Sequence, residues 1–346
     1  MENNEIQVVD IFCGVGGLTH GLQQAGLKAT AGIDSDHTCR YAYEVNNKAT
    51  FIHSDIENTK PEDVLQLFTG EAIKVLAACA PCQPFSTHTL KYKFDSKDSR
   101  WNLLDYFRRI VLHVLPEIVT IENVRRLSKE PIFSKFLTTL SKQGYNISWK
   151  DIYCPQYGIP QSRTRLVLLA SRLHTITMIP PSHEPRQYIR VQDVIADLPP
   201  IKAGETDNND PLHRSAGLRE LNLKRIRQSI PGGTWRDWDK DLRLQCHSKK
   251  TGYSYVSIYG RMSWTQLAPT ITTQFYNIGT GRFGHPEQDR ALSLREAALL
   301  QTFPPDYQFY DPQNPLPLTI TAKHIGNAVP VRLGYIIGKS IVDHLQ

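Results

Sequence analysis

The residues best suited to chemistry lie in the segment Pro81-Cys82-Gln83-Pro84-Phe85-Ser86. The apolar run over residues 75–79 that precedes it predicts a buried strand. Cys82 therefore follows a strand end and lies between two prolines, which fix their own φ angles and restrict the residue before them. Such a stiff loop presents a thiol for reaction, whereas a cysteine that only fills a core needs no flanking prolines. We interpret Cys82 as a nucleophile.

Cys79 and Cys82 also form a C-x-x-C pair, and this motif has two other interpretations. A redox dithiol needs a thioredoxin-like βαβ unit around it, and a zinc site needs a second pair of ligands. The remaining four cysteines form no second C-x-x-C, and no H-x3-5-H pair is present. A nucleophile that acts alone is the better interpretation, and we expect no metal.

A glycine-rich turn near the N-terminus predicts a ligand site. The strand-like residues 6–12 lead directly into Gly14, Gly16 and Gly17, and a helical stretch follows. This order brings a nucleotide-like ligand to the N-terminus of a helix. Thr19 occupies the third glycine position of the dinucleotide pattern G-x-G-x-x-G, which disfavours a nicotinamide or flavin oxidoreductase.

Three acidic residues follow or end successive predicted strands, namely Asp10, Asp34 and Asp55. Asp34 comes twenty residues after Gly14, where a carboxylate can accept hydrogen bonds from both ribose hydroxyls. A sheet edge rich in acids suits a ribose, an adenine amino group and a cationic ligand. It does not suit a triphosphate, which would require lysine or arginine.

Strands and helices alternate along the first half of the chain. Further strands are predicted over residues 74–79, 117–121 and 166–170, with helices over 101–115 and 132–143. This alternation predicts a doubly wound sheet that is covered on both faces and binds ligands at the carboxyl ends of its strands. Cys82 and Glu122 both follow or end such strands, so we expect them to meet in one pocket.

Length and composition favour an intracellular protein with an anionic partner. A chain of 346 residues is long enough for two domains. Its formal net charge of +6 indicates an anionic partner. Its six cysteines are irregularly spaced, and no apolar run approaches the ~18 residues of a membrane span, so a cytoplasmic location away from membranes is expected. Residues 213–261 contain eleven basic and four acidic residues interleaved with aromatics. This composition fits a phosphate-contacting surface, and it fits the solvated, charged face of an ordinary domain about equally well.

Six motifs, in order, give the chain a family resemblance. They occupy residues 10–17, 81–86, 122–124, 161–165, 290–304 and 326–330. Together they resemble the S-adenosylmethionine-dependent cytosine-C5 DNA methyltransferases of bacterial and phage modification systems. In some members of the family, an aromatic residue follows the ribose-binding acid and stacks on the adenine. This chain has Ser35 at that position, so Phe12 is expected to carry more of the adenine contact.

The resemblance implies an α/β fold with a doubly wound, mostly parallel sheet of the class I methyltransferase, Rossmann-like kind. It also implies a second, smaller and irregular target-recognition domain. We expect a discontinuous catalytic domain over residues 1–180 and 318–346, and the DNA-binding recognition domain over 181–317. A monomer that acts on double-stranded DNA is expected, with a cognate restriction endonuclease as a possible partner for the same site.

The resemblance and the chemistry of cytosine together suggest roles for individual residues. Cys82 would add to C6, and Glu122 would give N3 a proton or a strong hydrogen bond. Arg165 would stabilise charge at O2, and Arg163 would orient Glu122 or contact the target strand. The expected cofactor-binding residues are Asp10, Phe12, Gly14, Gly16, Gly17, Asp34, Asp55, Ile56, Asn327 and Val329. The expected DNA contacts are Gln83, Ser86, Arg100 and Gln161, and the loop over residues 86–100 is expected to close over the DNA.

Two other functions fit parts of the sequence. An RNA cytosine methyltransferase can be built on the same domain, but its Cys-Phe-Thr signature is missing here. A catalytically inactive, DNA-binding regulatory subunit would have lost the thiol or the carboxylate. Both Cys82 and Glu122 are present, so an active DNA-modifying enzyme is favoured.

Overall fold

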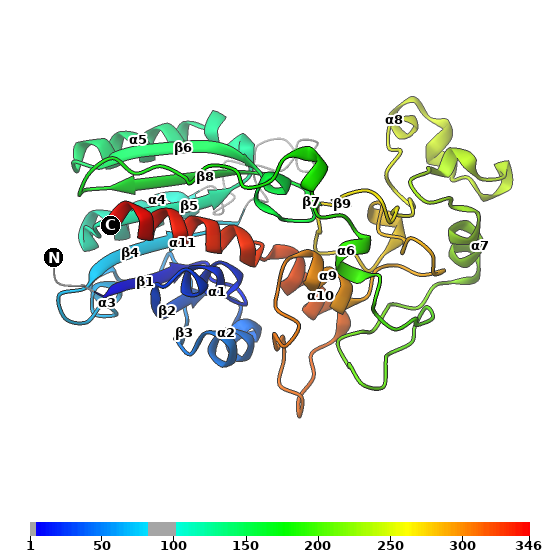
Figure 1. Cartoon of the computed structure of the whole chain (residues 1–346), viewed down its shortest axis with the longest axis horizontal. Helices are drawn as coiled ribbons and strands as arrows, with labels where there is room; N and C mark the ends of the chain where they lie inside the picture. The colour runs from blue at the N-terminus through cyan, green and yellow to red at the C-terminus, as the bar shows by residue number, and fades with distance from the viewer. Residues whose placement is uncertain (1–4, 82–101) are drawn as a thin grey trace.

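A seven-stranded sheet forms the centre of the larger part of the molecule (Figure 1). The computed structural model describes residues 5–81 and 102–346. The strands are β1 (Ile6–Ile11), β2 (Lys28–Asp34), β3 (Thr50–His53), β4 (Ile73–Ala78), β5 (Ile118–Asn123), β6 (Asn146–Tyr153) and β8 (Thr164–Ser171). Their order is β3-β2-β1-β4-β5-β8-β6. β8 runs antiparallel to both of its neighbours, β5 and β6, and the remaining neighbouring pairs are parallel. The expected doubly wound, mostly parallel sheet is confirmed.

Helices cover both faces of this sheet. One layer contains α1 (Gly17–Gln24), α2 (Arg40–Asn47) and α11 (Val331–Leu345), and the other contains α3 (Pro61–Leu65), α4 (Leu103–Val114) and α5 (Pro131–Lys142). Successive side chains of a strand point to opposite faces. Val8 of β1 therefore packs in the core under α1 and α11, and Val9 packs in the core under α4 and α5.

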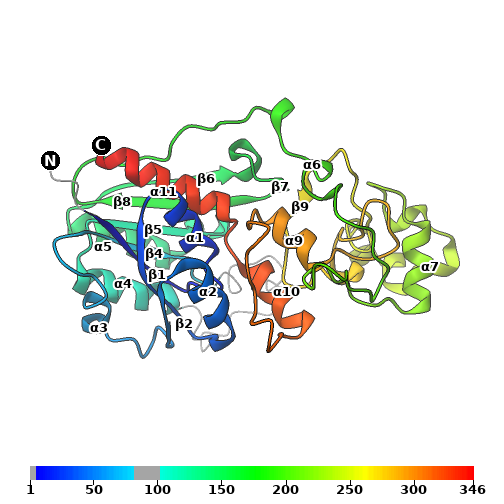
Figure 2. The ribbon, with the colours of Figure 1, turned by 60° about the horizontal axis from the view of Figure 1, so that its bottom comes forward.

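The C-terminal helix lies directly against α1, as both views show (Figures 1 and 2). A Cβ atom on Gly21 would lie 2.2 Å from the carbonyl oxygen of Val331, so only glycine permits this close approach. Residues 318–345 form two helices, α10 (Leu318–Asn327) and α11, with a short break between them. The break precedes Pro330, which lacks an N–H and disfavours helical backbone in the residue before it.

The smaller part is irregular, as expected. It contains α6 (Gln192–Ile195), α7 (Glu220–Gln228), α8 (Lys250–Tyr253) and α9 (Leu294–Leu300), and β9 (Ala268–Pro269) pairs in parallel with β7 (Gln161–Ser162). The core beneath α1 and α11 continues into it through Phe275, Phe283 and Leu292. The proposed domain limits at residues 181 and 317 stay a prediction, because this core crosses both. No helix within the described ranges has the length and apolar character needed to cross a membrane.

Candidate active site

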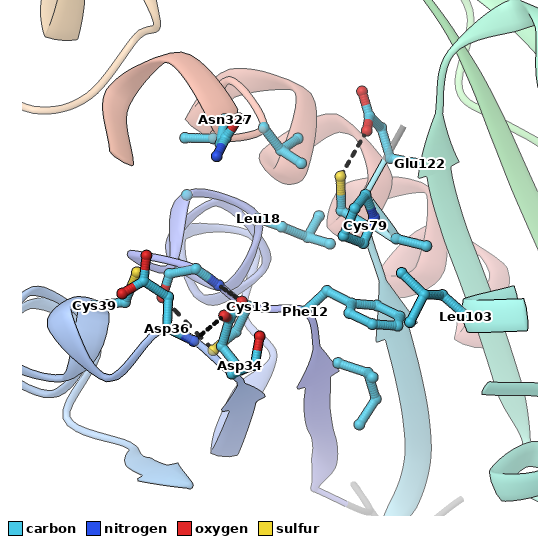
Figure 3. Close-up of a pocket in the computed structure, with 18 of the residues that line it drawn as sticks. Phe12, Cys13, Leu18, Asp34, Asp36, Cys39, Cys79, Leu103, Glu122 and Asn327 are labelled. Carbon is cyan, nitrogen blue, oxygen red and sulfur yellow. Dashed lines mark hydrogen bonds between the residues drawn. The ribbon is translucent and has the colours of Figure 1, made fainter. Parts of the chain in front are cut away.

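A cavity of about 420 Å³ lies at the carboxyl ends of the central strands (Figure 3). Residues that follow or end β1, β2, β4 and β5 line it, together with residues of α10. Its volume falls within the range of small-molecule sites. Of the residues expected to bind a cofactor, its lining includes Phe12, Gly14, Gly17, Asp34, Asp55, Ile56, Asn327 and Val329. Glu122, Arg163 and Arg165 line the same cavity, so the two groups of predicted residues meet.

The glycine turn follows β1 and leads into α1. Gly14 and Gly16 both have positive φ, 50° and 88°, and Phe12 shares this left-handed conformation at 63°. Gly16 is the N-cap of α1 and does not line the cavity; a Cβ there would lie 2.3 Å from Nδ2 of Asn47. Gly17 lies so close to the carbonyl of Val329 that a Cβ would approach it to 2.5 Å. The turn is thus held between α2 and the segment after α10.

Asp34 is the acid best placed for a ligand. It ends β2, lines the cavity, and accepts hydrogen bonds from the backbone N–H groups of Gly14 (2.8 Å) and Asp36 (2.9 Å). Burial raises the pKa of its carboxyl. Asp55 lies on the exposed side of the cavity and accepts the N–H of Glu57 at 3.0 Å.

Asp10 was expected to contact the cofactor, but it does not line the cavity. Its side chain is 1% exposed and accepts a hydrogen bond of 2.6 Å from Oγ1 of Thr19 on α1. Burial is the main cause that raises its pKa to about 7. Asp10 therefore joins β1 to α1 beneath the glycine turn and contacts the site only indirectly.

Glu122 provides a buried carboxyl at the far end of the cavity. It lies near the end of β5, is 2% exposed, and has Nε of Arg165 at 3.2 Å from its Oε1 atom. The guanidinium of Arg163 approaches the same oxygen to 4.0 Å. The thiol of Cys79 donates a hydrogen bond of 3.0 Å to Oε2 (Figure 3). The carboxyl is thus held by cations on one oxygen and a thiol on the other.

Arg165 lies on β8, and Arg163 directly precedes this strand. Arg163 is 5% exposed, and burial, followed by the charge of Arg165, lowers its pKa to about 10. Arg163 lies next to Glu122, and its expected role, to orient Glu122 or to contact the target strand, stays a prediction. The side-chain amide of Asn123 donates a hydrogen bond of 2.9 Å to the carbonyl oxygen of Ala80, which joins the end of β5 to the segment that follows β4.

Gln161 was expected to contact DNA, and its placement contradicts this. Its side chain is 0% exposed, donates to the carbonyl of Leu300 (2.7 Å) and to Oε1 of Gln301 (2.8 Å), and accepts the N–H of Ile271 (3.1 Å). All of these partners are protein groups in the junction between β7, β9 and α9. Gln161 is therefore a buried structural residue in this junction.

Cys82, Gln83, Ser86 and Arg100 lie outside the described residues. The expected closure of the loop over residues 86–100 lies outside them as well. Pro81, the neighbour of Cys82 in sequence, lines the cavity and is described.

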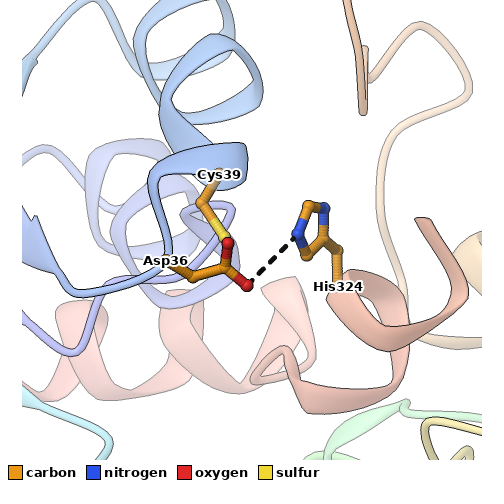
Figure 4. Close-up of side chains that lie close together, drawn as sticks. All are labelled: Asp36, Cys39 and His324. Carbon is orange, nitrogen blue, oxygen red and sulfur yellow. Dashed lines mark ion pairs between the residues drawn. The ribbon is translucent and has the colours of Figure 1, made fainter. Parts of the chain in front are cut away.

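A second polar group lies on the α10 side of the cavity, where Asp36, Cys39 and His324 come together (Figure 4). These residue types can ligate a metal, but Asp36 and the Nε2 atom of His324 already have partners in the chain. The ammonium group of Lys323 lies 2.8 Å from Asp36, and the Thr38 hydroxyl lies 2.9 Å from Nε2 of His324. The cluster is best described as a polar link between the end of β2 and α10. Sequence reasoning passed over it because His324 is more than 280 residues away from Asp36 and Cys39.

A family comparison explains this arrangement. The model of the C-5 cytosine-specific DNA methylase family matches residues 6–343. The chain belongs to this family. It is 48% identical to the Type II methylase M.HgiDII of Herpetosiphon aurantiacus, over 98% of this chain and 96% of that protein. It is 31% identical to the Type II methyltransferase M.Eco47II of Escherichia coli, over 100% of this chain and 81% of that protein.

Solved structures agree on the fold. A DNA modification methyltransferase encoded within a prophage of Escherichia coli matches with a TM-score of 0.75 and 20% identity, over 99% of both chains. A methyltransferase of Entamoeba histolytica matches with a TM-score of 0.69 and 18% identity, over 99% of this chain and 100% of that one. The chain is thus an S-adenosylmethionine-dependent DNA cytosine-C5 methyltransferase with a class I methyltransferase fold.

Proposed function

We propose that this methyltransferase swings a cytosine out of duplex DNA and methylates its C5 atom while Cys82 is covalently bonded to C6. The observation that carries the proposal is the single cavity lined both by the glycine turn with Asp34 and by Glu122 with Arg165. One space can therefore hold a methyl donor and a base next to each other.

The residues of the cavity fit S-adenosylmethionine. Asp34 would accept the ribose hydroxyls, Phe12 and Ile56 would contact the adenine, and Gly14 and Gly17 let the ligand approach the backbone. The acids at this edge, Asp34 and Asp55, favour a ligand with positive charge. When bound, this cofactor supplies an electrophilic methyl group on a sulfonium.

Glu122, Arg165 and Cys82 would activate the base. Cytosine C5 is a weak nucleophile until the Cys82 thiolate adds to C6 and makes the ring enamine-like. A proton or a strong hydrogen bond from Glu122 to N3 makes this addition easier. Arg165, whose guanidinium is 3.2 Å from Glu122, would stabilise the negative charge that develops toward O2.

The reacting atoms of cytosine are stacked inside the duplex, so the base must leave the stack at a cost of a few kcal/mol. After C5 accepts the methyl group, a base removes the C5 proton, the Cys82–C6 bond breaks, and the thiolate is regenerated. The smaller part of the molecule, about residues 181–317, would read the DNA sequence. Because the relatives M.HgiDII and M.Eco47II are named Type II methylases, we propose that this enzyme protects sites from a restriction endonuclease.

A duplex that carries 5-fluorocytosine at the target site tests the proposal. Fluorine replaces the C5 proton and cannot be removed by a base, so the wild-type enzyme should remain covalently attached in the presence of S-adenosylmethionine. The adduct is measured as a shifted band on a denaturing gel. The target site for this duplex is first identified by bisulfite sequencing of DNA from cells that express the enzyme.

Cys82→Ser should form no adduct and should lose at least about 10³-fold in turnover, because a hydroxyl at this position is a far weaker nucleophile. Its affinity for S-adenosylmethionine should equal that of the wild type. Turnover near the wild-type level in this variant would show that Cys82 is not the nucleophile.

A further inference from the structure

Cys79 occupies a position that the proposed mechanism leaves without a role. It directly follows β4, and its Sγ atom lies 3.0 Å from Oε2 of Glu122. It lines the same cavity as Glu122 and is partly exposed to it. We propose that the Cys79 thiol is a positioning residue, which orients the Glu122 carboxyl and stabilises its ionised form after the proton has moved to N3 of the base.

The groups around Glu122 divide between its two oxygens. Arg165 and Arg163, from the β8 side, approach Oε1 to 3.2 and 4.0 Å. Oε2 accepts the hydrogen bond from Cys79, from the β4 side. A further titratable neighbour among the described residues is Cys154, whose pKa burial raises to about 11, so it adds no charge at neutral pH. Cys79 is therefore the donor to Oε2 that the described part of the site provides.

A donor to Oε2 has a definite effect on acid catalysis. A hydrogen bond to a carboxylate stabilises the charged form more than the neutral form. This inference rests on the proposed function, in which a proton moves from the Glu122 carboxyl to N3 and leaves a carboxylate behind. The thiol keeps its own proton throughout, and its S–H bond to Oε2 strengthens as the negative charge forms. The same bond fixes the side-chain rotamer before the base enters.

The test compares Cys79→Ala with Cys79→Ser by the pH dependence of kcat and kcat/KM. Alanine removes the donor, so the Glu122 carboxyl becomes a weaker acid. We expect kcat to fall roughly 3- to 10-fold, and the alkaline limb of the profile to move up by about half to one pH unit, as for the loss of one hydrogen bond from a weak S–H donor. KM for S-adenosylmethionine should not change.

Serine keeps a donor at the same position, and an O–H bond to a carboxylate is at least as strong as an S–H bond. The alkaline limb of the Cys79→Ser profile should therefore lie at the same pH as that of the wild type or at a lower pH. Its kcat should recover to within about threefold of the wild type. Cys246→Ala, which removes an exposed thiol far along the chain, is the matched control and should behave as the wild type. Thermal melting of each variant shows whether it folds.

Two outcomes overturn the inference. One is a Cys79→Ala profile that coincides with the wild-type profile, and the other is a Cys79→Ser profile that moves with that of alanine. Glu122→Gln separates this result from the mechanism itself. Wild-type turnover in Glu122→Gln would reject the proposed role of Glu122. Loss of turnover there, together with an unchanged Cys79→Ala profile, would reject the role of Cys79 alone.

Discussion

Asp34 illustrates how a single carboxyl prepares the cofactor side of the cavity. Its two oxygens accept the N–H groups of Gly14 and Asp36, so it holds the turn after β1 and the turn after β2 together. A carboxylate has about four acceptor positions, so two are left for ribose hydroxyls. Because these backbone bonds fix its orientation, a ligand does not have to order this side chain.

Asp34→Ala should lower the affinity for S-adenosylmethionine by roughly 10- to 100-fold. This range corresponds to the removal of one or two hydrogen bonds to a charged group, at about 1.5 kcal/mol or more each. DNA affinity should change less than threefold, because the residue faces the cofactor end of the cavity. Isothermal titration calorimetry and fluorescence anisotropy measure the two affinities.

Asp63→Ala, on the exposed side of α3, is the matched control. Equal losses of cofactor and DNA affinity in Asp34→Ala would contradict the ribose role, and would point to a general loss of structure.

Much of the site could be predicted at this scale, because motif residues at strand ends must meet at one edge of the sheet. Phe12, Asp34, Ile56 and Asn327 all line the cavity as expected. The same reasoning was wrong for Asp10, since a motif does not reveal which way a side chain faces within its strand. Cys79 was considered only as the partner of Cys82, because its contact with Glu122 depends on how β4 and β5 are paired.

At the level of elements, the bond between Asp10 and Thr19 joins the first strand to the first helix. Both side chains are buried, and the acid accepts its hydrogen bond from the Thr19 hydroxyl. Thr19 takes the place of a glycine in the dinucleotide pattern, so the residue that argued against such a cofactor also has a structural use. An acid in this environment makes stability depend on pH.

Asp10→Asn should reduce that dependence. Burial raises the pKa of Asp10 from 3.8 to about 7, so between these values the folded chain holds a proton that the unfolded chain has released. The wild-type free energy of unfolding should therefore fall as pH rises from about 4 to 7, by at most about 1.4 kcal/mol per unit from this group, and level off above. Asparagine does not titrate, so the difference between variant and wild type isolates this contribution.

Urea unfolding at pH 5, 6, 7 and 8 measures the effect, and Asp63→Asn serves as a control for an exposed acid. If the two stability curves for Asp10→Asn and wild type are parallel over this range, Asp10 is ionised in the folded protein throughout.

The strands were predicted within one or two residues wherever an apolar run is buried on both faces, as in β4 and β5. β6 (Asn146–Tyr153) was missed, because it is an edge strand whose residues are mostly exposed or half-buried and carry no clear period. The exposed Trp149 and Lys150 in its middle give little indication of a strand. Local sequence reveals a central strand more readily than an edge strand.

At the scale of the whole molecule, the basic segment over residues 213–261 does not form one uniform surface. Arg225 and Arg261 are buried, as are Trp235 and Trp238, and they form part of the interior of the smaller region. Arg261 is 4% exposed and donates to the carbonyls of Ile226, Ser229, His285 and Gln288. Composition alone could not separate these structural residues from those that remain available to DNA.

Helix α7 permits a direct test, because it contains both kinds of basic residue within four positions. Lys224 and Arg227 are exposed, whereas Arg225 is buried against Trp238 and Tyr259. If α7 contacts phosphates, the double variant Lys224→Ala/Arg227→Ala should weaken DNA binding similarly for all sequences. The slope of log K against log salt concentration should then become shallower by about 1 to 2, or roughly 0.9 for each phosphate that the protein no longer neutralises.

For the buried Arg261 we expect a loss of stability, in contrast to the exposed residues of α7. Arg261→Ala leaves several buried carbonyls without a donor, so it should destabilise the smaller region by about 3 kcal/mol or more. Its loss of DNA affinity should accompany a lower melting temperature, whereas the α7 double variant should melt like the wild type. A double variant with an unchanged salt slope would show that this face of α7 does not contact the phosphate backbone, and DNA binding would then have to use other basic residues.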